Sequence, residues 1–397
     1  MEGNTYNGRA WVEIDLDRLR RNYRALREKI GETRKVLVAV KADAYGHGAV
    51  EISRTLQQEG VDMVGVASVD EAVELKLGGI ECPIVVLSPT TFDFIPIILK
   101  NGFRPNVSNF QYAQSLSTAA LRMDTRAKVH IEIDTGMGRT GVPWAEAFNF
   151  IRKTQDLAGI EVEGIFTHFA VAEESRKYTG EQMGKFLKVL HQLETHGIAI
   201  PLKHCANSAG ILHYPDSYLN MVRPGLILYG LFPNSASRTI DIRPIMSFKT
   251  RIVHIQRIPS GNSISYGRKF ITQRDSIIAT ISVGYGDGYS RSLSNRGEVI
   301  IRGRRARIVG TICMDLTMVD CSDISDIQLG DEVTLIGRDG LEEMTPDELA
   351  NLVGTISYEV TSSIGPRVPR IFVSNGLPSG IKSLLGHENC LLHSQNG

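Results

Sequence analysis

Residues 36–48 read VLVAVKADAYGHG, a short apolar run that ends in a lysine. The run Val36–Val40 contains no charged residue and is bounded by charge, which is typical of a strand buried on both faces of a parallel sheet. The spacing of apolar residues predicts a helix over about residues 49–58. This strand–helix unit is the element that the first part of the chain repeats.

Strand-like runs recur through the first part of the chain, with helical patterns between them. They lie at Val61–Ala67, Pro83–Leu87, Phe103–Val107, Lys128–Ile133, Val162–Phe166, Leu202–Cys205 and Met221–Arg223. About eight strand–helix repeats in roughly 230 residues predict an eight-stranded parallel α/β barrel of the TIM type. An open doubly wound sheet is the alternative that this pattern leaves open.

The character of the sequence changes after about Pro244. Short strand-like runs, separated by turns rich in Gly, Asn and Asp, predict a mainly β C-terminal domain. They lie at Ser247–Ile258, Ser276–Val283, Glu298–Arg302, Ala306–Gly310, Met314–Asp320 and Glu332–Ile336. We therefore expect a barrel domain over residues 1–242, a β-strand-rich domain over residues 243–378 and a tail over residues 379–397.

The composition is that of an ordinary globular protein. Of the 397 residues, 42% are hydrophobic and 22% charged, so extensive disorder is not expected. Lys and Arg (44) balance Asp and Glu (44), which argues against a partner such as nucleic acid or an anionic membrane bound through bulk charge. The five cysteines form no CxxC pair, and no segment reaches the roughly 18 apolar residues of a membrane span. We expect a cytoplasmic protein without a signal peptide, a disulfide framework or a metal site.

Polar side chains follow the predicted barrel strands at their carboxyl ends, where the active sites of such barrels lie. Lys41 ends the first strand, and partial burial there would lower the pKa of its amine and free it for Schiff-base or proton-transfer chemistry. Arg139, His168, Ser208 and Arg223 follow the fifth to the eighth strands. Each of these residues taken singly is explained as well by a structural role. Their occurrence together at successive strand ends favours an active site.

The last two predicted barrel strands end at the usual phosphate-binding place of such barrels. Ser208 and Gly225 lie there, and they could offer a hydroxyl and a backbone amide to a phosphate group. The sequence contains no GxGxxG or Walker spacing, so a dinucleotide or a nucleoside triphosphate is not indicated.

A series of motifs across the chain resembles alanine racemases, and the motifs follow one another in the family's order. They are VAVKADAYGHG (Val38–Gly48), DTGMGRTG (Asp134–Gly141), THFA (Thr167–Ala170), ANSAG (Ala206–Gly210), VRPGLILYG (Val222–Gly230), SYG (Ser265–Gly267), GYGDGY (Gly284–Tyr289), CMD (Cys313–Asp315), TISYEV (Thr355–Val360) and RVPR (Arg367–Arg370). The resemblance runs from about Ala10 to Phe372. It favours the closed barrel over the open sheet.

The resemblance implies a pyridoxal-phosphate-dependent isomerase that interconverts L-alanine and D-alanine and supplies D-alanine for peptidoglycan. Lys41 would hold the cofactor as a Schiff base and would also be the base on the D-face of the substrate. Tyr266 would be the base on the L-face, so that a proton leaves one face and returns on the other. Because the family builds each site from two subunits, Tyr266, Tyr285 and Met314 would act across a homodimer interface.

The resemblance also implies roles for the residues around the cofactor. Tyr45, Ser208, Gly225, Leu226 and Tyr358 would hold the phosphate. Arg223 would face the pyridine nitrogen, and because an arginine does not readily give up a proton, that nitrogen would stay unprotonated and transamination would be disfavoured. His168 is also expected to bind the cofactor, and its imidazole and nearby arginines could supply the field that lowers the pKa of Tyr266. Arg139 and Met314 would meet the substrate carboxylate, and Asp315 would support them.

Three positions depart from the family's common pattern. Glu132 stands where many members carry a carbamylated lysine, and we hypothesise that its carboxylate pairs with Arg139 and orients it without carbon dioxide. The alternative is that Glu132 is an exposed strand charge. Thr311 and Leu316 lie near the expected substrate entrance and leave the specificity open.

Other functions therefore remain as alternatives. One is a racemase of other or broader specificity, for serine or lysine. Another is a non-catalytic protein that binds pyridoxal phosphate. A decarboxylase is disfavoured, because related decarboxylases place a carboxylate where this sequence has Arg223.

Overall fold

The computed structural model describes residues 8–233 and 239–388. The described residues form two compact units. The first, here the barrel unit, comprises Arg20–Ala44 and Ala49–Arg243, and the second, here the β unit, comprises residues 8–19, Tyr45–Gly48 and residues 244–388. The sequence analysis placed everything up to residue 242 in one barrel domain. The N-terminal residues and the Tyr45–Gly48 segment depart from that expectation, because they make their contacts with the β unit.

Eight parallel strands close into a barrel in the barrel unit. They are β2 (Lys35–Ala39), β3 (Met63–Val66), β4 (Ile84–Pro89), β5 (Arg104–Asn106), β6 (Ala127–Asp134), β8 (Ile160–Phe166), β9 (Leu202–His204) and β10 (Met221–Val222). The pairing of β5 with β6, at Asn106 and His130, closes the ring. The predicted closed barrel is therefore confirmed, and the open sheet is excluded.

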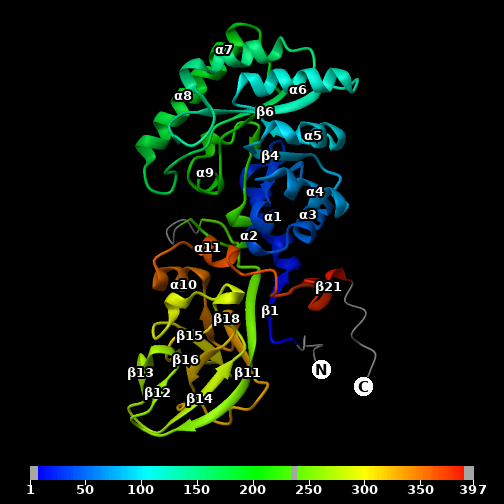
Figure 1. Ribbon diagram of the computed structural model, residues 1–397. Coiled ribbons are helices and arrows are strands. Elements are labelled where there is room, and N and C mark those ends of the chain that lie inside the picture. Colours follow the sequence, from blue (N-terminus) through cyan, green and yellow to red (C-terminus); the bar gives the residue numbers. More distant parts are fainter. Residues whose placement is uncertain (1–7, 234–238, 389–397) are drawn as a thin grey trace. The chain divides into compact units, whose positions relative to one another are not determined.

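Side chains fill the inside of this barrel and helices cover its outside. Leu37, Met63, Val85, Leu202 and Met221, from five of the barrel strands, form one buried cluster. Figure 1 shows the helices around the strands. They include α3 (Ala49–Gln58), α4 (Val69–Leu77), α5 (Ile95–Asn101), α6 (Phe110–Arg122), α7 (Trp144–Gln155) and α8 (Arg176–Thr195). Because the interior is packed with side chains, the substrate is expected to meet the residues at the carboxyl ends of the strands.

The β unit is built around the long strand β11 (Met246–Ile258), drawn in green in Figure 1. The other strands of its ring are β14 (Ser276–Ile281), β15 (Glu298–Ile301), β16 (Arg304–Ile308), β17 (Thr317–Asp320) and β18 (Glu332–Asp339). These strands pair antiparallel in the order β11-β14-β17-β16-β15-β18, and β18 pairs with β11 again. Closure leaves this part of the sheet without free edges. The predicted mainly β domain is confirmed.

The two ends of the described chain extend the same sheet. β1 (Ala10–Asp15) pairs antiparallel with β11 and parallel with β20 (Arg370–Ser374), and β21 (Leu377–Ser383) and β22 (Gly386–Glu388) follow at the edge. The expected tail from residue 379 is therefore corrected, because its first residues lie in these strands. Trp11, Ile371 and Ile381 hold them through one buried apolar cluster. Residues 389–397 of that expected tail lie outside the described residues.

The turn that follows Lys41 is left-handed. Residues 42–45 of α2 (Lys41–Gly46) have φ values between 52° and 56°. This conformation costs L-residues roughly 1–2 kcal/mol each, so the turn depends on the contacts that hold it. The Ala42 amide donates to Glu71 Oε1 (2.6 Å), and the Ala49 amide donates to Asp43 Oδ1 (2.7 Å).

Gly46 ends this turn in a place that has no room for a side chain. Its φ is +85°, and a Cβ would lie 2.2 Å from the carbonyl oxygen of Thr361 in α11 (Ser357–Ser362). We expect Gly46→Ala to lower the free energy of unfolding by at least about 2 kcal/mol in urea titrations. Gly60→Ala is the matched control, because Gly60 has φ +83° but open space around it. It should lose only roughly 1 kcal/mol. Equal losses would contradict the steric argument.

Candidate active site

Lys41 follows strand β2 at the carboxyl end of the barrel. Burial lowers the pKa of its amine, and the charges of Arg139 and Arg223 act in the same direction, whereas Glu71 acts against them. A lowered pKa leaves more of the amine neutral, which is the form that attacks a carbonyl or accepts a proton. The site residues predicted at the strand ends thus influence one another electrostatically.

Arg223 is buried directly after strand β10, and only 6% of it is exposed. Its Nη1 donates to His204 Nδ1 (2.9 Å) and to the His204 carbonyl (2.8 Å), and its Nη2 donates to the Thr167 carbonyl (2.7 Å). Burial lowers the pKa of Arg223 to about 10, so the group stays charged at neutral pH. Among the described residues no carboxylate forms an ion pair with it, so its neighbours orient a positive charge without neutralising it.

His168 follows strand β8 and lies beside Arg223. Its Nδ1 is 3.4 Å from Arg223 Nη2. Burial lowers the pKa of His168 well below its ordinary value, and the charges of Arg223, Arg139 and Lys41 add to this effect. The imidazole is therefore neutral. Because its Nδ1 faces a group that can only donate, its proton is assigned to Nε2.

The residues predicted to hold a phosphate fall into two groups. In the barrel unit, the Gly225 amide donates to Ser208 Oγ (3.2 Å), and Leu226 follows directly as the first residue of η3 (Leu226–Tyr229). In the β unit, burial and the neighbouring Tyr358 raise the pKa of Tyr45 to about 12, so this phenol keeps its proton and can donate it to an anion.

Glu132 is buried in strand β6, with 3% of the residue exposed. Its Oε2 accepts hydrogen bonds from Asn106 Nδ2 (2.9 Å) and Thr140 Oγ1 (2.7 Å). Its Oε1 is 3.9 Å from Arg139 Nη2. Glu132 is thus not an exposed strand charge, and Asn106 and Thr140 orient its carboxylate.

Three loops of the β unit carry the predicted residues Tyr266, Tyr285 and Met314. Their side chains are exposed, Tyr266 by 71%. Thr311 Oγ1 donates to the Tyr266 carbonyl (2.9 Å), and the Gly286 amide donates to the Met314 carbonyl (2.9 Å), so hydrogen bonds to backbone carbonyls join these loops. Large exposed side chains on fixed backbone are typical of residues that meet another surface.

A buried carboxylate that the sequence analysis did not single out fixes two of these loops. Asp287 has no exposed surface, and it accepts from the Gly284 amide (2.9 Å) and from Arg367 Nε (2.8 Å). Arg367 Nη2 also donates to Asp315 Oδ1 (2.8 Å). Arg367 therefore connects the GYGDGY and CMD segments, which gives the predicted supporting residue Asp315 a partner.

The sequence analysis also missed a group of residues inside the barrel. His130 and His204 lie in β6 and β9 without exposed surface, and Glu163 lies between them in sequence, in β8. The available signal was the presence of histidines within apolar strand-like runs, where a polar ring needs hydrogen-bond partners.

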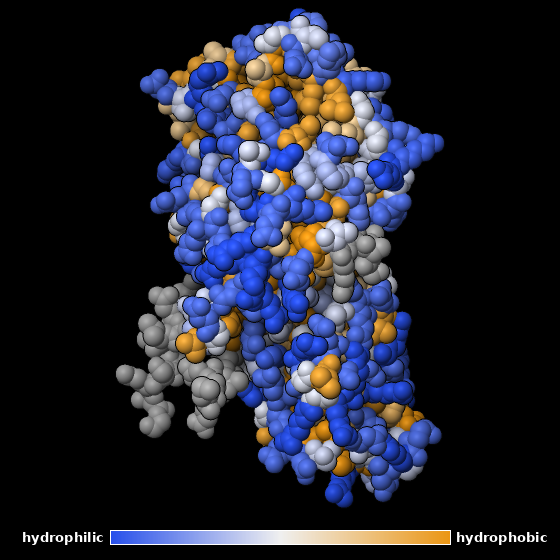
Figure 2. All heavy atoms as spheres, turned by 180° about the vertical axis from the view of Figure 1, so that it is seen from behind, coloured by the Kyte–Doolittle hydropathy of each residue, from blue (hydrophilic) through white to orange (hydrophobic). Residues whose placement is uncertain are grey.

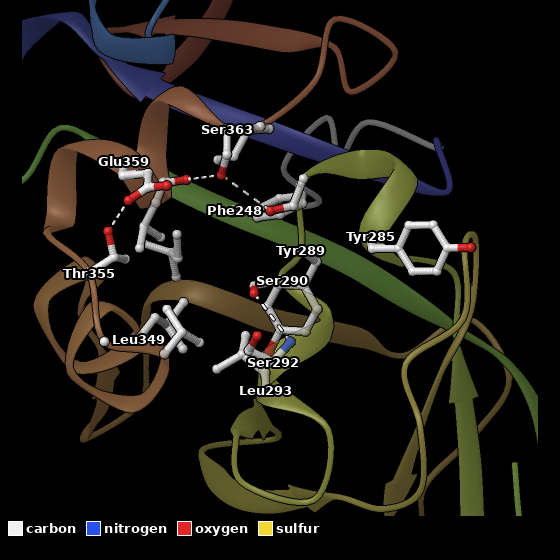
Figure 3. Close-up of a pocket in the computed structure, with 16 residues that line it drawn as sticks. Phe248, Tyr285, Tyr289, Ser290, Ser292, Leu293, Leu349, Thr355, Glu359 and Ser363 are labelled. Atoms are coloured by element: carbon white, nitrogen blue, oxygen red, sulfur yellow. Dashed lines mark hydrogen bonds between the residues drawn. The ribbon is translucent and has the colours of Figure 1, made fainter. Parts of the chain in front are cut away.

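A cavity of about 530 Å³ lies in the β unit. Tyr285 is among its lining residues, but Figure 3 shows the Tyr285 ring pointing away from Tyr289 and the other labelled side chains. The lining contains no lysine, arginine or histidine. It therefore does not supply the bases predicted for the reaction.

Three further findings concern the surface, the helices and possible metal sites. Figure 2 shows one face of the molecule, where hydrophilic residues predominate and hydrophobic residues gather mainly near the top of the view. Within residues 8–233 and 239–388, no helix is long and apolar enough to cross a membrane. In the same part of the chain, no group of three or more His, Cys, Asp or Glu side chains is placed to hold a metal ion.

Comparison with known proteins identifies the family. Residues 14–233 match the family model of the alanine racemase N-terminal domain, and residues 245–372 match that of the C-terminal domain. An alanine racemase of Clostridium tetani is 46% identical over 378 residues, which are 94% of this chain and 97% of that protein. The chain belongs to the alanine racemase family. The resemblance inferred from the motifs is thereby confirmed.

Solved structures of alanine racemases share the whole architecture. The alanine racemase of Clostridium difficile 630 has a TM-score of 0.93 at 38% identity, over 96% of this chain and 100% of that chain. That of Bartonella henselae has a TM-score of 0.83 at 30% identity, over 92% of this chain and 100% of that chain, and contains covalently bound pyridoxal phosphate.

The lowered pKa of Lys41 predicts unusual reactivity of its amine. In the protein without cofactor, limited acetylation followed by mass spectrometry should label Lys41 at lower pH than a fully exposed lysine. Arg139→Gln removes a positive charge, so the pKa of Lys41 should rise and its labelling at pH 7 should slow about threefold. Arg126→Gln is the control, since Arg126 is not among the groups that shift Lys41. Unchanged labelling in Arg139→Gln would show that the charge of Arg139 does not contribute to the reactivity.

Proposed function

We propose that the protein interconverts L-alanine and D-alanine, with pyridoxal phosphate bound through Lys41. The observation that carries this proposal is that two groups occur together at the strand ends. One is the Lys41 amine, whose pKa is lowered, and the other is buried Arg223, which has no carboxylate partner among the described residues. A carboxylate beside the cofactor nitrogen would favour its protonation, whereas Arg223 disfavours it. This arrangement supports racemisation over transamination or decarboxylation.

The residues present fit this cofactor. The Lys41 amine would hold its aldehyde carbon, and Ser208, Gly225, Leu226, Tyr45 and Tyr358 would hold its phosphate. Within the described residues, both Nη atoms of Arg223 have acceptors, and Nε is the donor left for the pyridine nitrogen. When bound, pyridoxal phosphate withdraws electron density from Cα and makes its proton acidic.

Two bases on opposite faces would then move the proton. The neutral Lys41 amine would take the Cα proton from D-alanine and return it to that face. Tyr266 of the partner subunit would do the same on the L-face, in a homodimer with shared sites. The exposure of Tyr266, Tyr285 and Met314 supports this role. The proton on His168 Nε2 would stabilise the phenolate form of that tyrosine by a hydrogen bond.

Arg139 would bind the substrate carboxylate. We propose that Glu132 holds Arg139 in place by charge, from a carboxylate that Asn106 and Thr140 have already oriented. The intrinsic carboxylate would make this orientation independent of carbon dioxide.

The setting of the reaction and its specificity are also part of the proposal. A supply of D-alanine for peptidoglycan follows from the family resemblance. A cytoplasmic location is proposed with it, and the free thiols of Cys82, Cys205, Cys313 and Cys321 are compatible with a reducing compartment. The Thr311 hydroxyl donates a hydrogen bond to the backbone carbonyl of Tyr266. This departure from the family pattern therefore acts on the loop of the second base.

The first test measures inversion directly. Purified protein with pyridoxal phosphate is incubated with single L-amino acids and analysed by chiral chromatography. We expect D-alanine to dominate, Lys41→Ala to abolish turnover, and Tyr266→Phe to keep the bound cofactor while losing at least about 100-fold in kcat. Greater conversion of serine or lysine would reassign the specificity. Bound cofactor without inversion of any amino acid would favour the non-catalytic alternative.

Glu132 is tested by removing its charge at constant size. Glu132→Gln should raise the KM for alanine or lower kcat, by about tenfold in kcat/KM, because Arg139 loses its negative partner. Wild-type activity should not change when bicarbonate is removed from the buffer. Wild-type kinetics in Glu132→Gln would eliminate the proposed role.

A further inference from the structure

A row of buried polar groups continues from Arg223 into the barrel. Arg223 Nη1 lies 2.9 Å from His204 Nδ1, and His204 Nε2 lies 2.9 Å from His130 Nδ1. His130 Nε2 then lies 3.4 Å from Glu163 Oε2. This last distance is long for a hydrogen bond, so the contact is largely the attraction between an N–H dipole and a carboxylate. Both histidines have no exposed surface, and Glu163 is 8% exposed.

The local structure makes room for this row. His130 faces Gly164 across the β6–β8 pair, and a Cβ on Gly164 would lie 2.6 Å from His130 Nδ1. The register of the two strands shifts at the same place, between Val129 and His130. The ring of Phe166 stacks on His204, with centroids 5.0 Å apart. Arg223 Cζ lies 5.1 Å from the centroid of the Phe166 ring. A glycine and a β-bulge at one imidazole are typical of a required contact.

The donors and acceptors of the row can be arranged in one way. Arg223 can only donate, so His204 Nδ1 must accept and the proton of neutral His204 lies on Nε2. That proton is donated to His130 Nδ1, so the proton of neutral His130 lies on its own Nε2, which is 3.4 Å from Glu163 Oε2. A second proton on either ring would set two N–H groups against each other.

The charges around the row agree with this polarity. Burial lowers the pKa of both histidines, that of His204 well below its ordinary value. Burial alone would raise the pKa of Glu163, but His130, Arg104 and Lys128 outweigh it and bring the pKa to about 2. Arg104 Nε and Lys128 Nζ each lie 3.3 Å from this carboxylate. The row therefore runs from a fixed cation to a fixed anion.

We propose that Glu163 is a positioning residue for Arg223. By attracting the N–H of His130 (3.4 Å), it holds the proton of that imidazole on Nε2, supports the arrangement in which His204 Nδ1 accepts from Arg223 Nη1, and so leaves Nε directed to the cofactor nitrogen. The consequence for the reaction rests on the role proposed above for Arg223. The proton positions do not rest on it, because they follow from the protein's own contacts.

Glu163→Gln tests the carboxylate at nearly constant volume. An amide can present N–H groups to His130, which would reverse the row and set His204 Nδ1–H against Arg223. Glu161→Gln is the matched control, because Glu161 is in the same strand and also pairs with Lys128 (3.6 Å), but within the described residues it forms no ion pair with His130. Glu163→Asp keeps the charge and should restore much of what Glu163→Gln loses.

The first readout is independent of cofactor and activity. Imidazole ¹⁵N spectra of the histidine-labelled protein, with signals assigned by single-site variants, should show His130 and His204 neutral with the proton on Nε2 at pH 7. This pattern should persist in Glu161→Gln and change in Glu163→Gln. Protonation of His130 on Nδ1, or on both nitrogens, in the wild-type protein would overturn the proposal. This measurement needs no variant at Glu163 to fold.

The second readout uses the protein loaded with pyridoxal phosphate. Glu163→Gln should lower kcat at least fivefold with less than a twofold change in the KM for alanine, shift the visible absorption band of the cofactor, and raise the ratio of pyruvate formed to alanine racemised. Glu161→Gln should do none of these. If Glu163→Gln keeps the wild-type kinetics and spectrum, the role of Glu163 is overturned, although the proposed racemase function stands. Absence of racemisation in the wild-type protein would instead refute the proposed function, while the imidazole spectra would still decide the arrangement of the row.

Discussion

Residues 42–45 hold a left-handed conformation directly after Lys41, and the place of that lysine depends on it. The conformation is unfavourable for L-residues, so it persists only because the surrounding structure determines it. Glu71 accepts from the amide at its start and Asp43 accepts from the amide of Ala49 beyond it. At its end, Arg370 Nε donates to the Gly46 carbonyl (3.1 Å). The strained turn thus fixes the backbone directly after strand β2 and, with it, the position of Lys41.

The second constraint is a charge that the barrel buries without neutralising. Arg223 has carbonyl and imidazole acceptors in place of a carboxylate, so its positive field acts on its neighbours. Burial lowers the pKa values of Lys41 and His168, and the charges of Arg223 and Arg139 add to this effect. The same group that would keep a cofactor nitrogen unprotonated therefore also helps to keep the amine and the imidazole neutral. Two carboxylates lie near this site but form no ion pair with Arg223 among the described residues. Glu132 is beside Arg139, and Glu163 is separated from Arg223 by the two histidines.

The third constraint is in the β unit, which holds exposed aromatic side chains at fixed positions. Buried Asp287 and its partner Arg367 fix the backbone that carries Tyr285 and Met314, and Thr311 fixes that of Tyr266. Rigid backbone beneath exposed side chains suits groups that act on another surface. This is the feature of the β unit that supports a site shared between two subunits.

The sequence by itself determined the closed barrel, the mainly β domain and the strand ends at which Lys41, Arg139, His168, Ser208 and Arg223 lie. It could do so because a buried parallel strand is a local apolar run, and because the family's motifs are contiguous in the chain. Tertiary structure alone decided the pairing of β1 with β11 and β20, the strands β21 and β22 in the expected tail, and the burial of Glu132. It alone brought His130, His204 and Glu163 into one row. Strand pairing and burial of a charged side chain depend on residues far apart in the sequence, so no local pattern records them.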